Sequence, residues 1–125
     1  MVVARRGIVS LDCDDPDTLA EFWAAMLGGE VMFRHDTSIV VRTEWLWMSA
    51  MRIPDYRAPT WPSNDVPKQI HLNLAVDNVE SAVAEALRLG ARIATFQPSP
   101  SEFRVMLDPA GHPFCLTTLP SEVSE

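Results

Sequence analysis

The 125-residue chain carries one order of secondary-structure signals twice, and this internal repeat constrains its fold more than any other feature. In the first copy, Asp15 supplies a helix N-cap and Gly28 stops the helix. In the second copy, Asn78 takes the capping position and Gly90 the stop position, with nearly the same spacing between cap and stop. An internal duplication explains this agreement. The predicted helices lie near residues 15–27 and 78–89.

Each predicted helix follows one strand-like segment and precedes three. The segments cover residues 8–12, 30–34, 38–42 and 45–51 in the first copy, and 69–76, 92–94, 103–107 and 113–119 in the second. One helix covers only one face of a four-stranded sheet, so the other face stays open. We therefore predict the α+β class, with two tandem βαβββ units forming a curved mixed sheet around a cavity that the open faces enclose. A ferredoxin-like fold would need the order βαββαβ, which three strands after each helix exclude.

The length predicts a single domain that spans residues 1–125. Within it, unit one covers about 7–53 and unit two about 68–119, and a connector covers 54–67. The connector holds four prolines together with Tyr56 and Trp61. This composition is too stiff and too apolar for a flexible linker, so we expect the connector to pack against the protein.

The balance of charge excludes some partners. Ten basic and seventeen acidic side chains give a net charge of −7, which repels nucleic acid. The acidic surface either attracts a cationic ligand or only keeps the protein in solution. No apolar run approaches the roughly 20 residues of a membrane helix, and no signal peptide is recognisable. Cys13 and Cys115 are too few for a secreted disulfide framework. We therefore expect a cytoplasmic protein with no membrane or nucleic-acid partner.

Five short motifs carry a resemblance to a known family. They are Leu11-Asp12-Cys13 with Asp15-Pro16, Phe22-Trp23 with Leu27-Gly28, Pro59-Thr60-Trp61-Pro62, His71-x-Asn73, and Asp108-Pro109-x-Gly111 with Phe114-Cys115. In this order and spacing the chain resembles the vicinal oxygen chelate superfamily, and more narrowly its glyoxalase-like actinobacterial members. The superfamily includes glyoxalase I, extradiol dioxygenases and bleomycin-resistance proteins. The resemblance implies the glyoxalase/bleomycin resistance fold.

The resemblance also implies where a metal would bind. Metal-using members take His, Glu or Gln ligands from the first and last strands of each unit. Here those positions hold Ile8, His71 and Cys115, and the last strand of unit one offers Ser49 or Met51. A hydrocarbon has no lone pair, a thioether suits only soft metals, and one His with one Cys does not complete a site. We therefore predict that the family's metal site is lost and that no cofactor is bound.

The second unit offers polar candidates for ligand binding. Strand alternation places His71 and Asn73 on one face, which the resemblance directs at the cavity. His71 either contacts a ligand, acts as an acid or base, or is structural, whereas an amide such as Asn73 can only recognise a ligand. Cys115 lies between Phe114 and Leu116, so we expect burial to raise the pKa of its thiol.

Aromatic and methionine side chains gather in the later strands of unit one and in the connector. Trp45 and Trp47 share one face of the predicted strand, so both belong to the ligand site or both to the core. Trp61, in the connector, is predicted to be a lid over the cavity. Cavity-facing parity also selects Ser10. The candidate ligand-binding residues are His71, Asn73, Trp47, Trp45, Trp61, Met51, Cys115 and Ser10.

Three functions compete. The sequence favours a metal-free protein, a homodimer, that binds a small aromatic or cationic molecule. The alternative is a lyase, isomerase or dioxygenase that uses His71 with a non-standard metal set. A third possibility is an interaction protein that only keeps the fold. No catalytic residue is assigned, because no motif for nucleophilic or hydrolytic chemistry is present.

Overall fold

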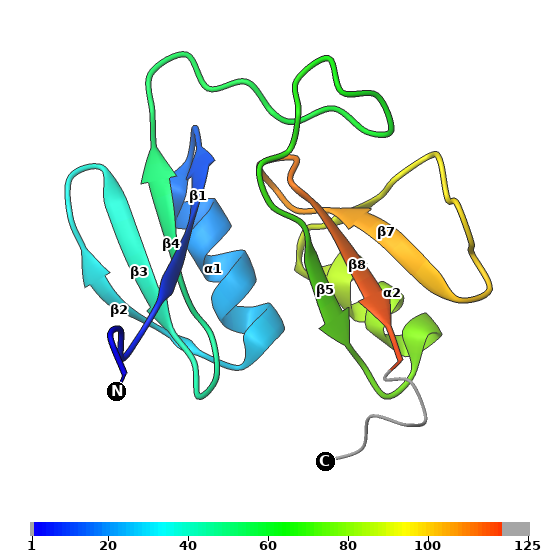
Figure 1. Ribbon diagram of the computed structural model, residues 1–125, viewed down its shortest axis with the longest axis horizontal. Coiled ribbons are helices and arrows are strands. Elements are labelled where there is room, and N and C mark those ends of the chain that lie inside the picture. The colour runs from blue at the N-terminus through cyan, green and yellow to red at the C-terminus, as the bar shows by residue number, and fades with distance from the viewer. Residues whose placement is uncertain (1, 119–125) are drawn as a thin grey trace. The chain divides into compact units, whose positions relative to one another are not determined.

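The computed structural model describes residues 2–118, and the chain divides into two compact units, Met1–Arg57 and Ala58–Glu125 (Figure 1). The elements of unit one are β1 (Ile8–Cys13), α1 (Pro16–Leu27), β2 (Glu30–Arg34), β3 (Ser38–Arg42) and β4 (Trp47–Arg52). Those of unit two are β5 (Leu72–Ala75), α2 (Val79–Leu89), β6 (Arg92–Ile93), β7 (Phe103–Leu107) and β8 (Pro113–Thr117). Both units have the predicted order βαβββ.

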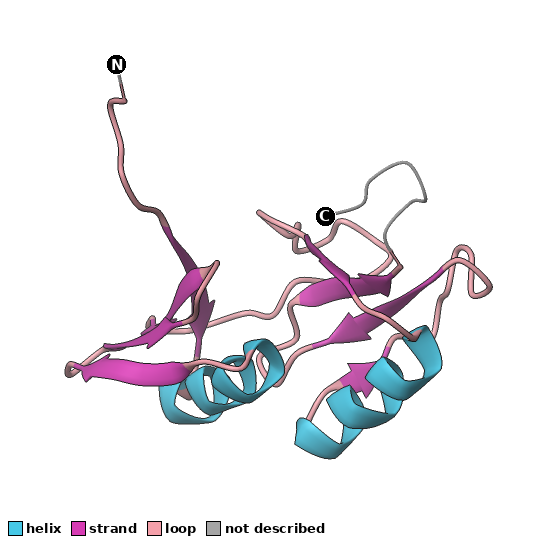
Figure 2. Ribbon diagram, turned by 90° about the horizontal axis from the view of Figure 1, so that it is seen from below, coloured by secondary structure: helices cyan, strands magenta, loops and turns pink. Residues whose placement is uncertain are grey.

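The two sheets have the same topology. Unit one has the strand order β1-β4-β3-β2 and unit two the order β5-β8-β7-β6. In each, the first and last strands of the unit pair in parallel and the other pairs are antiparallel, so both sheets are mixed. Each helix lies on one face of its own sheet (Figure 2). The prediction of a duplicated α+β unit is confirmed.

The helices begin and end where their capping residues require. The side chain of Asp15 accepts a hydrogen bond from the backbone N–H of Thr18, and that of Asn78 accepts one from Ser81. Gly28 and Gly90 follow the last helical residues with φ of 67° and 119°, a left-handed conformation that costs a glycine little. Capping by a single side chain is local chemistry, which is why the sequence predicted both helices within one residue.

The helix-facing side of each sheet forms the core. Its buried side chains include Leu11, Cys13, Leu19, Phe22, Trp23, Val41 and Met48 in unit one, and Leu74, Ala86, Met106, Phe114 and Leu116 in unit two. Along β1, burial alternates between exposed Ile8 and Ser10 and buried Leu11 and Cys13. Cys13 therefore faces the helix, as predicted, and within the described residues the two cysteines are not joined by a disulfide.

Two strand predictions are wrong in their details. β4 begins at Trp47 and not at residue 45, because the Thr43 hydroxyl accepts hydrogen bonds from the N–H groups of Trp45 and Leu46 and forms a turn. Trp45 is 65% exposed in this turn, so it does not share a strand face with Trp47. β5 begins at Leu72, which leaves His71 just before the strand.

The remaining differences lie at other strand ends. β1 and β4 each extend one residue beyond the prediction, to Cys13 and Arg52, and β6 ends one residue before Ala94. The last predicted strand reached residue 119, which lies outside the described residues; β8 ends at Thr117.

The connector packs against the protein, as its composition predicted. Its part from Ala58 onward belongs to unit two. A Cβ on Gly111 would lie 2.8 Å from the Cβ of Ala58, so glycine permits this close contact. The Thr60 hydroxyl bonds the backbone of Ser63 and Val66 and holds the segment in a compact loop. Within residues 2–118, no helix is long and apolar enough to cross a membrane.

Candidate functional site

The open face of the unit two sheet brings together the polar residues that the sequence selected. β5 pairs in parallel with β8 so that Asn73 lies opposite Cys115. His71 precedes β5, and its Nε2 lies 2.9 Å from the Sγ of Cys115. The Asn73 side chain is on an exposed position of β5, while Cys115 is only 4% exposed. The face therefore offers a partly exposed imidazole, an exposed amide and a buried thiol.

Trp61 covers part of this face. Its ring packs against a buried cluster of Ala94, Val105 and Cys115. The ring centroid lies 6.3 Å from that of His71, in an edge-on arrangement. Trp61 Nε1 donates a hydrogen bond to the carbonyl oxygen of Phe96 at 3.1 Å, which fixes the orientation of the indole. The connector thus contributes a wall to the site within its own unit. The role of Trp61 as a lid over the cavity stays a prediction.

Burial sets the ionisation of the His71–Cys115 pair. Desolvation, and then the nearby charge of Lys68, lower the pKa of His71 below its usual 6.5. Desolvation raises the pKa of the Cys115 thiol, and Lys68 partly opposes this shift. Lys68 Nζ itself lies 4.9 Å from the centroid of the Trp61 ring. Both members of the pair are therefore neutral near pH 7, and the burial that we predicted for Cys115 has the expected effect.

A neutral imidazole and a neutral thiol recognise ligands in a particular way. One of them donates to the other, depending on the imidazole tautomer, and each retains a single further hydrogen-bonding function. The Asn73 amide adds both a donor and an acceptor. Together with the Trp61 ring, these groups can orient a small molecule, and the protonated thiol of Cys115 is a poor nucleophile at neutral pH.

Unit one has a different set of residues on its open face. β1 pairs with β4 so that Ser10 lies opposite Ser49, and their Oγ atoms are 2.6 Å apart. Ser10 and Asn73 precede their helix caps by the same spacing, so Ser49, the partner of Ser10, corresponds to Cys115. Met51 lies two residues further along β4, on the same face. The register thus assigns the family position that the sequence left open to Ser49.

These donors do not fit the metal site that the fold family implies. Ile8 is a hydrocarbon, the Ser49 hydroxyl is hydrogen-bonded to Ser10, and His71 is hydrogen-bonded to Cys115. Neutral serine hydroxyls are poor ligands for divalent ions, which prefer imidazole, thiolate or carboxylate. No group of three His, Cys, Asp or Glu side chains that could hold a metal occurs in the part of the chain that the structure describes.

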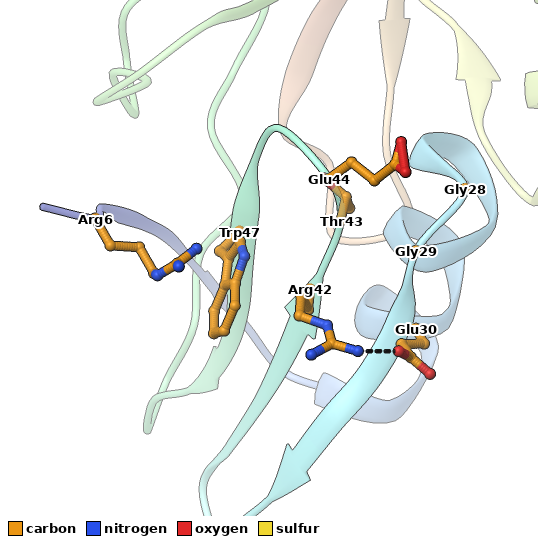
Figure 3. A pocket seen from close by; sticks show the side chains of 8 residues that line it. All are labelled: Arg6, Gly28, Gly29, Glu30, Arg42, Thr43, Glu44 and Trp47. Carbon is orange, nitrogen blue, oxygen red and sulfur yellow. Dashed lines mark hydrogen bonds and ion pairs between the residues drawn. The ribbon is translucent and has the colours of Figure 1, made fainter.

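A groove of about 610 Å³ occupies one end of unit one (Figure 3). The residues that line it are Arg6, Gly28, Gly29, Glu30, Arg42, Thr43, Glu44 and Trp47. The Arg6 guanidinium lies 4.5 Å from the centroid of the Trp47 ring, and Arg42 forms an ion pair with Glu30. Of the predicted site residues, only Trp47 lines this groove.

The sequence did not indicate the groove's charged residues. Arg42 lies at alternate positions with Ser38 and Val40 on β3, so strand parity could have placed it on the open face. Nothing in the local pattern indicated Arg6, which lies before the first strand. The structure therefore gathers four predicted residues, His71, Asn73, Trp61 and Cys115, in unit two. It leaves Ser10, Met51 and Trp47 on the sheet of unit one and Trp45 in a turn.

Comparisons with known proteins agree with this fold. The family model described as Glyoxalase-like domain matches residues 8–117. A glyoxalase/bleomycin resistance protein/dioxygenase family enzyme from Burkholderia phytofirmans has a TM-score of 0.68 at 16% identity, covering 90% of this chain and 97% of the other. Fosfomycin resistance protein FosX from Mesorhizobium loti has a TM-score of 0.69 at 11% identity, covering 98% and 96%.

A third solved structure contains a bound molecule. The bleomycin-binding protein from Streptomyces verticillus, complexed with copper(II)-bleomycin, has a TM-score of 0.60 at 19% identity and covers 96% of this chain and 100% of the other. At such identities the likeness concerns the fold and not the ligand. A comparison with curated protein sequences found no match.

Proposed function

Because the chain belongs to the glyoxalase-like domain family, we propose that it binds a small aromatic or cationic molecule on the open face of unit two without the metal that many relatives of this fold use. The observation that carries the proposal is the 2.9 Å contact between His71 Nε2 and Cys115 Sγ. These residues occupy two of the positions where metal ligands are expected, and their side chains contact each other there. The narrower resemblance to actinobacterial members stays a prediction.

The composition of the unit two face supports a binding role. Apolar sites with a few fixed polar groups are typical of small-molecule recognition. Here the Trp61 ring supplies the apolar wall, and His71 and Asn73 supply the polar groups. The solved relatives include one protein described as binding bleomycin and others described as conferring fosfomycin resistance. A sequestering protein of this class needs fixed hydrogen-bonding groups, which the neutral His71–Cys115 pair supplies.

The proposal includes a setting. We propose that the protein acts in the cytoplasm as a homodimer. We also propose that it has no nucleic-acid partner, because its net charge of −7 repels phosphate backbones. Sedimentation at micromolar concentration measures the oligomeric state directly.

A ligand screen tests the binding role. We expect at least one compound from a set of aromatic and cationic metabolites and antibiotics, including metal-free bleomycin, to raise the melting temperature in the presence of EDTA. A ligand that binds only the folded state stabilises it by mass action. Failure of every probe, or stabilisation that needs an added divalent ion, would contradict the proposal.

Variants locate the ligand that the screen identifies. Asn73→Ala removes an exposed amide and should weaken binding by about 0.5–1.5 kcal/mol, the usual range for one hydrogen bond, without lowering the melting temperature of the free protein. Ser101→Ala, an exposed change in the turn before β7, is the matched control and should leave affinity unchanged. Equal affinity in wild type and Asn73→Ala would exclude this face.

A further inference from the structure

The aromatic wall of the unit one groove is covered by a cation from the same chain. Arg6 belongs to the segment before β1, and its guanidinium lies 4.5 Å from the centroid of the Trp47 ring (Figure 3). An indole face attracts a planar cation through its quadrupole, and this attraction is strongest when the cation is poorly hydrated, as a guanidinium is. The structure thus displays the kind of group that this wall accepts.

The charges of the groove become complementary to a cation once Arg6 leaves. Two arginines and two glutamates line the groove, so its charges balance. Arg42 forms its ion pair with Glu30, whereas none of the ion pairs among residues 2–118 involves Glu44. Without Arg6 the lining has a net charge of −1, and Glu44 is the carboxylate that remains for a ligand.

The C-terminal end of α1 also favours a cation in the groove. Gly28 and Gly29 bring the C-terminus of the helix into the groove, and the last turn of α1 contains no basic residue. The C-terminal end of a helix carries a partial negative charge that favours cations. Gly28 leaves open space where a side chain would stand, whereas the Thr43 methyl packs against Gly29. The C-terminus of α1, Glu44 and the Trp47 ring therefore all favour a cationic ligand.

We propose that this groove binds a planar organic cation with an amidinium or guanidinium group, which stacks on the Trp47 ring in place of Arg6. Its volume of about 610 Å³ lies within the range of small-molecule sites. Arg6 then acts as an internal competitor that weakens binding and that the ligand displaces. This inference rests on the proposed function only in one respect, which is that the ligand is a small molecule. It concerns residues of unit one alone, whereas the proposed function concerns the open face of unit two.

The experiment uses three ring compounds that differ in charge. Benzamidinium is the cationic probe, benzamide its neutral counterpart and benzoate its anionic counterpart. Each is titrated into the full-length, ¹⁵N-labelled protein, and the indole N–H signal of Trp47 and the Nε–H signal of Arg6 are followed by NMR. The signals are assigned with Trp47→Phe and Arg6→Ala.

We expect benzamidinium to shift both signals and benzamide to bind several-fold more weakly. Arg6→Ala should raise the affinity for benzamidinium about two- to fivefold, the equivalent of one exposed cation–π contact. Arg5→Ala removes the same charge from the neighbouring position and should change affinity by less than Arg6→Ala does. Glu44→Gln, which preserves the shape of the side chain, should weaken benzamidinium binding about twofold or more.

Three results would overturn the inference. They are benzoate binding more tightly than benzamidinium, equal affinity in Arg6→Ala and Arg5→Ala, and no titratable shift of the Trp47 signal in either wild type or Arg6→Ala. Asn73→Ala, which tests the face of unit two, should leave benzamidinium binding in the groove unchanged. Shifts confined to Trp61 and lost in Asn73→Ala would reject the groove and leave the proposed function standing.

Discussion

His71 and Cys115 lie in contact, and the burial that accompanies this contact keeps both neutral. Desolvation disfavours the charged form of each group, which lowers the pKa of the imidazole and raises that of the thiol. The pair is therefore suited to accepting and donating hydrogen bonds, and the protonated thiol is a poor nucleophile. The same contact removes the two side chains at the family positions that could otherwise have held a metal.

The depressed pKa of His71 predicts a loss of stability in acid. Because the folded protein binds a proton at His71 less readily than the unfolded chain, stability from this residue is present above pH 6.5 and is lost as the pH falls below it. His71→Asn cannot take up this proton, so its free energy of unfolding should fall less than that of wild type between pH 7 and pH 5.5. Urea denaturation at several pH values measures both. His35→Asn, an exposed histidine of unit one, is the control.

The sequence predicted the chemistry of single residues better than their partners. The apolar neighbours of Cys115 indicated its burial, and strand parity indicated that Cys13 faces the helix. Contact between His71 and Cys115 depends on the register between β5 and β8. This register joins segments far apart in the sequence, so no local sequence pattern predicts it. Trp45 was wrongly placed in a strand because the Thr43 hydroxyl accepts hydrogen bonds that form a turn. The strand therefore begins two residues later than the hydrophobic pattern predicts.

At the scale of elements, the connector is part of unit two. Trp61 packs on the buried cluster and its indole N–H is held by Phe96, although nothing in strand or helix periodicity describes this segment. Proline content and the aromatic side chains indicated that it packs, but not on what. By contrast, helix caps act over three residues, and the sequence predicted both helices almost completely.

Removal of Trp61 should expose Cys115. The ring packs against Cys115, so Trp61→Ala opens the cluster, and we expect alkylation of the thiol by iodoacetamide at pH 8 to become at least several-fold faster. Mass spectrometry of the two cysteine peptides gives both rates from one sample. Cys13, fully buried in unit one, is the internal control. Equal acceleration of both would indicate global unfolding, and no change at Cys115 would show that Trp61 does not cover it.

At the scale of the whole molecule, duplication determines the architecture. The repeated order of caps and stops predicted two units, and the structure has the same strand order in each. The repeat did not preserve the site. Ile8 corresponds to His71, Ser10 to Asn73 and Ser49 to Cys115, so the open faces of the two units carry different donors. The cavity between open faces stays a prediction, because patterning along a chain does not define how sheets meet.

Titration with divalent metals tests most directly whether the His71–Cys115 pair is a hydrogen-bonded pair or half of a metal site. Protein purified without chelators is analysed for metals, and zinc, nickel, manganese and iron(II) are then added under calorimetry to wild type and His71→Ala. We expect no stoichiometric metal in either protein, because Ile8 and Ser49 supply no usual ligand and His71 with Cys115 does not complete a site. About one equivalent of metal bound by wild type and lost in His71→Ala would show that the pair is a metal site and would contradict the proposed function.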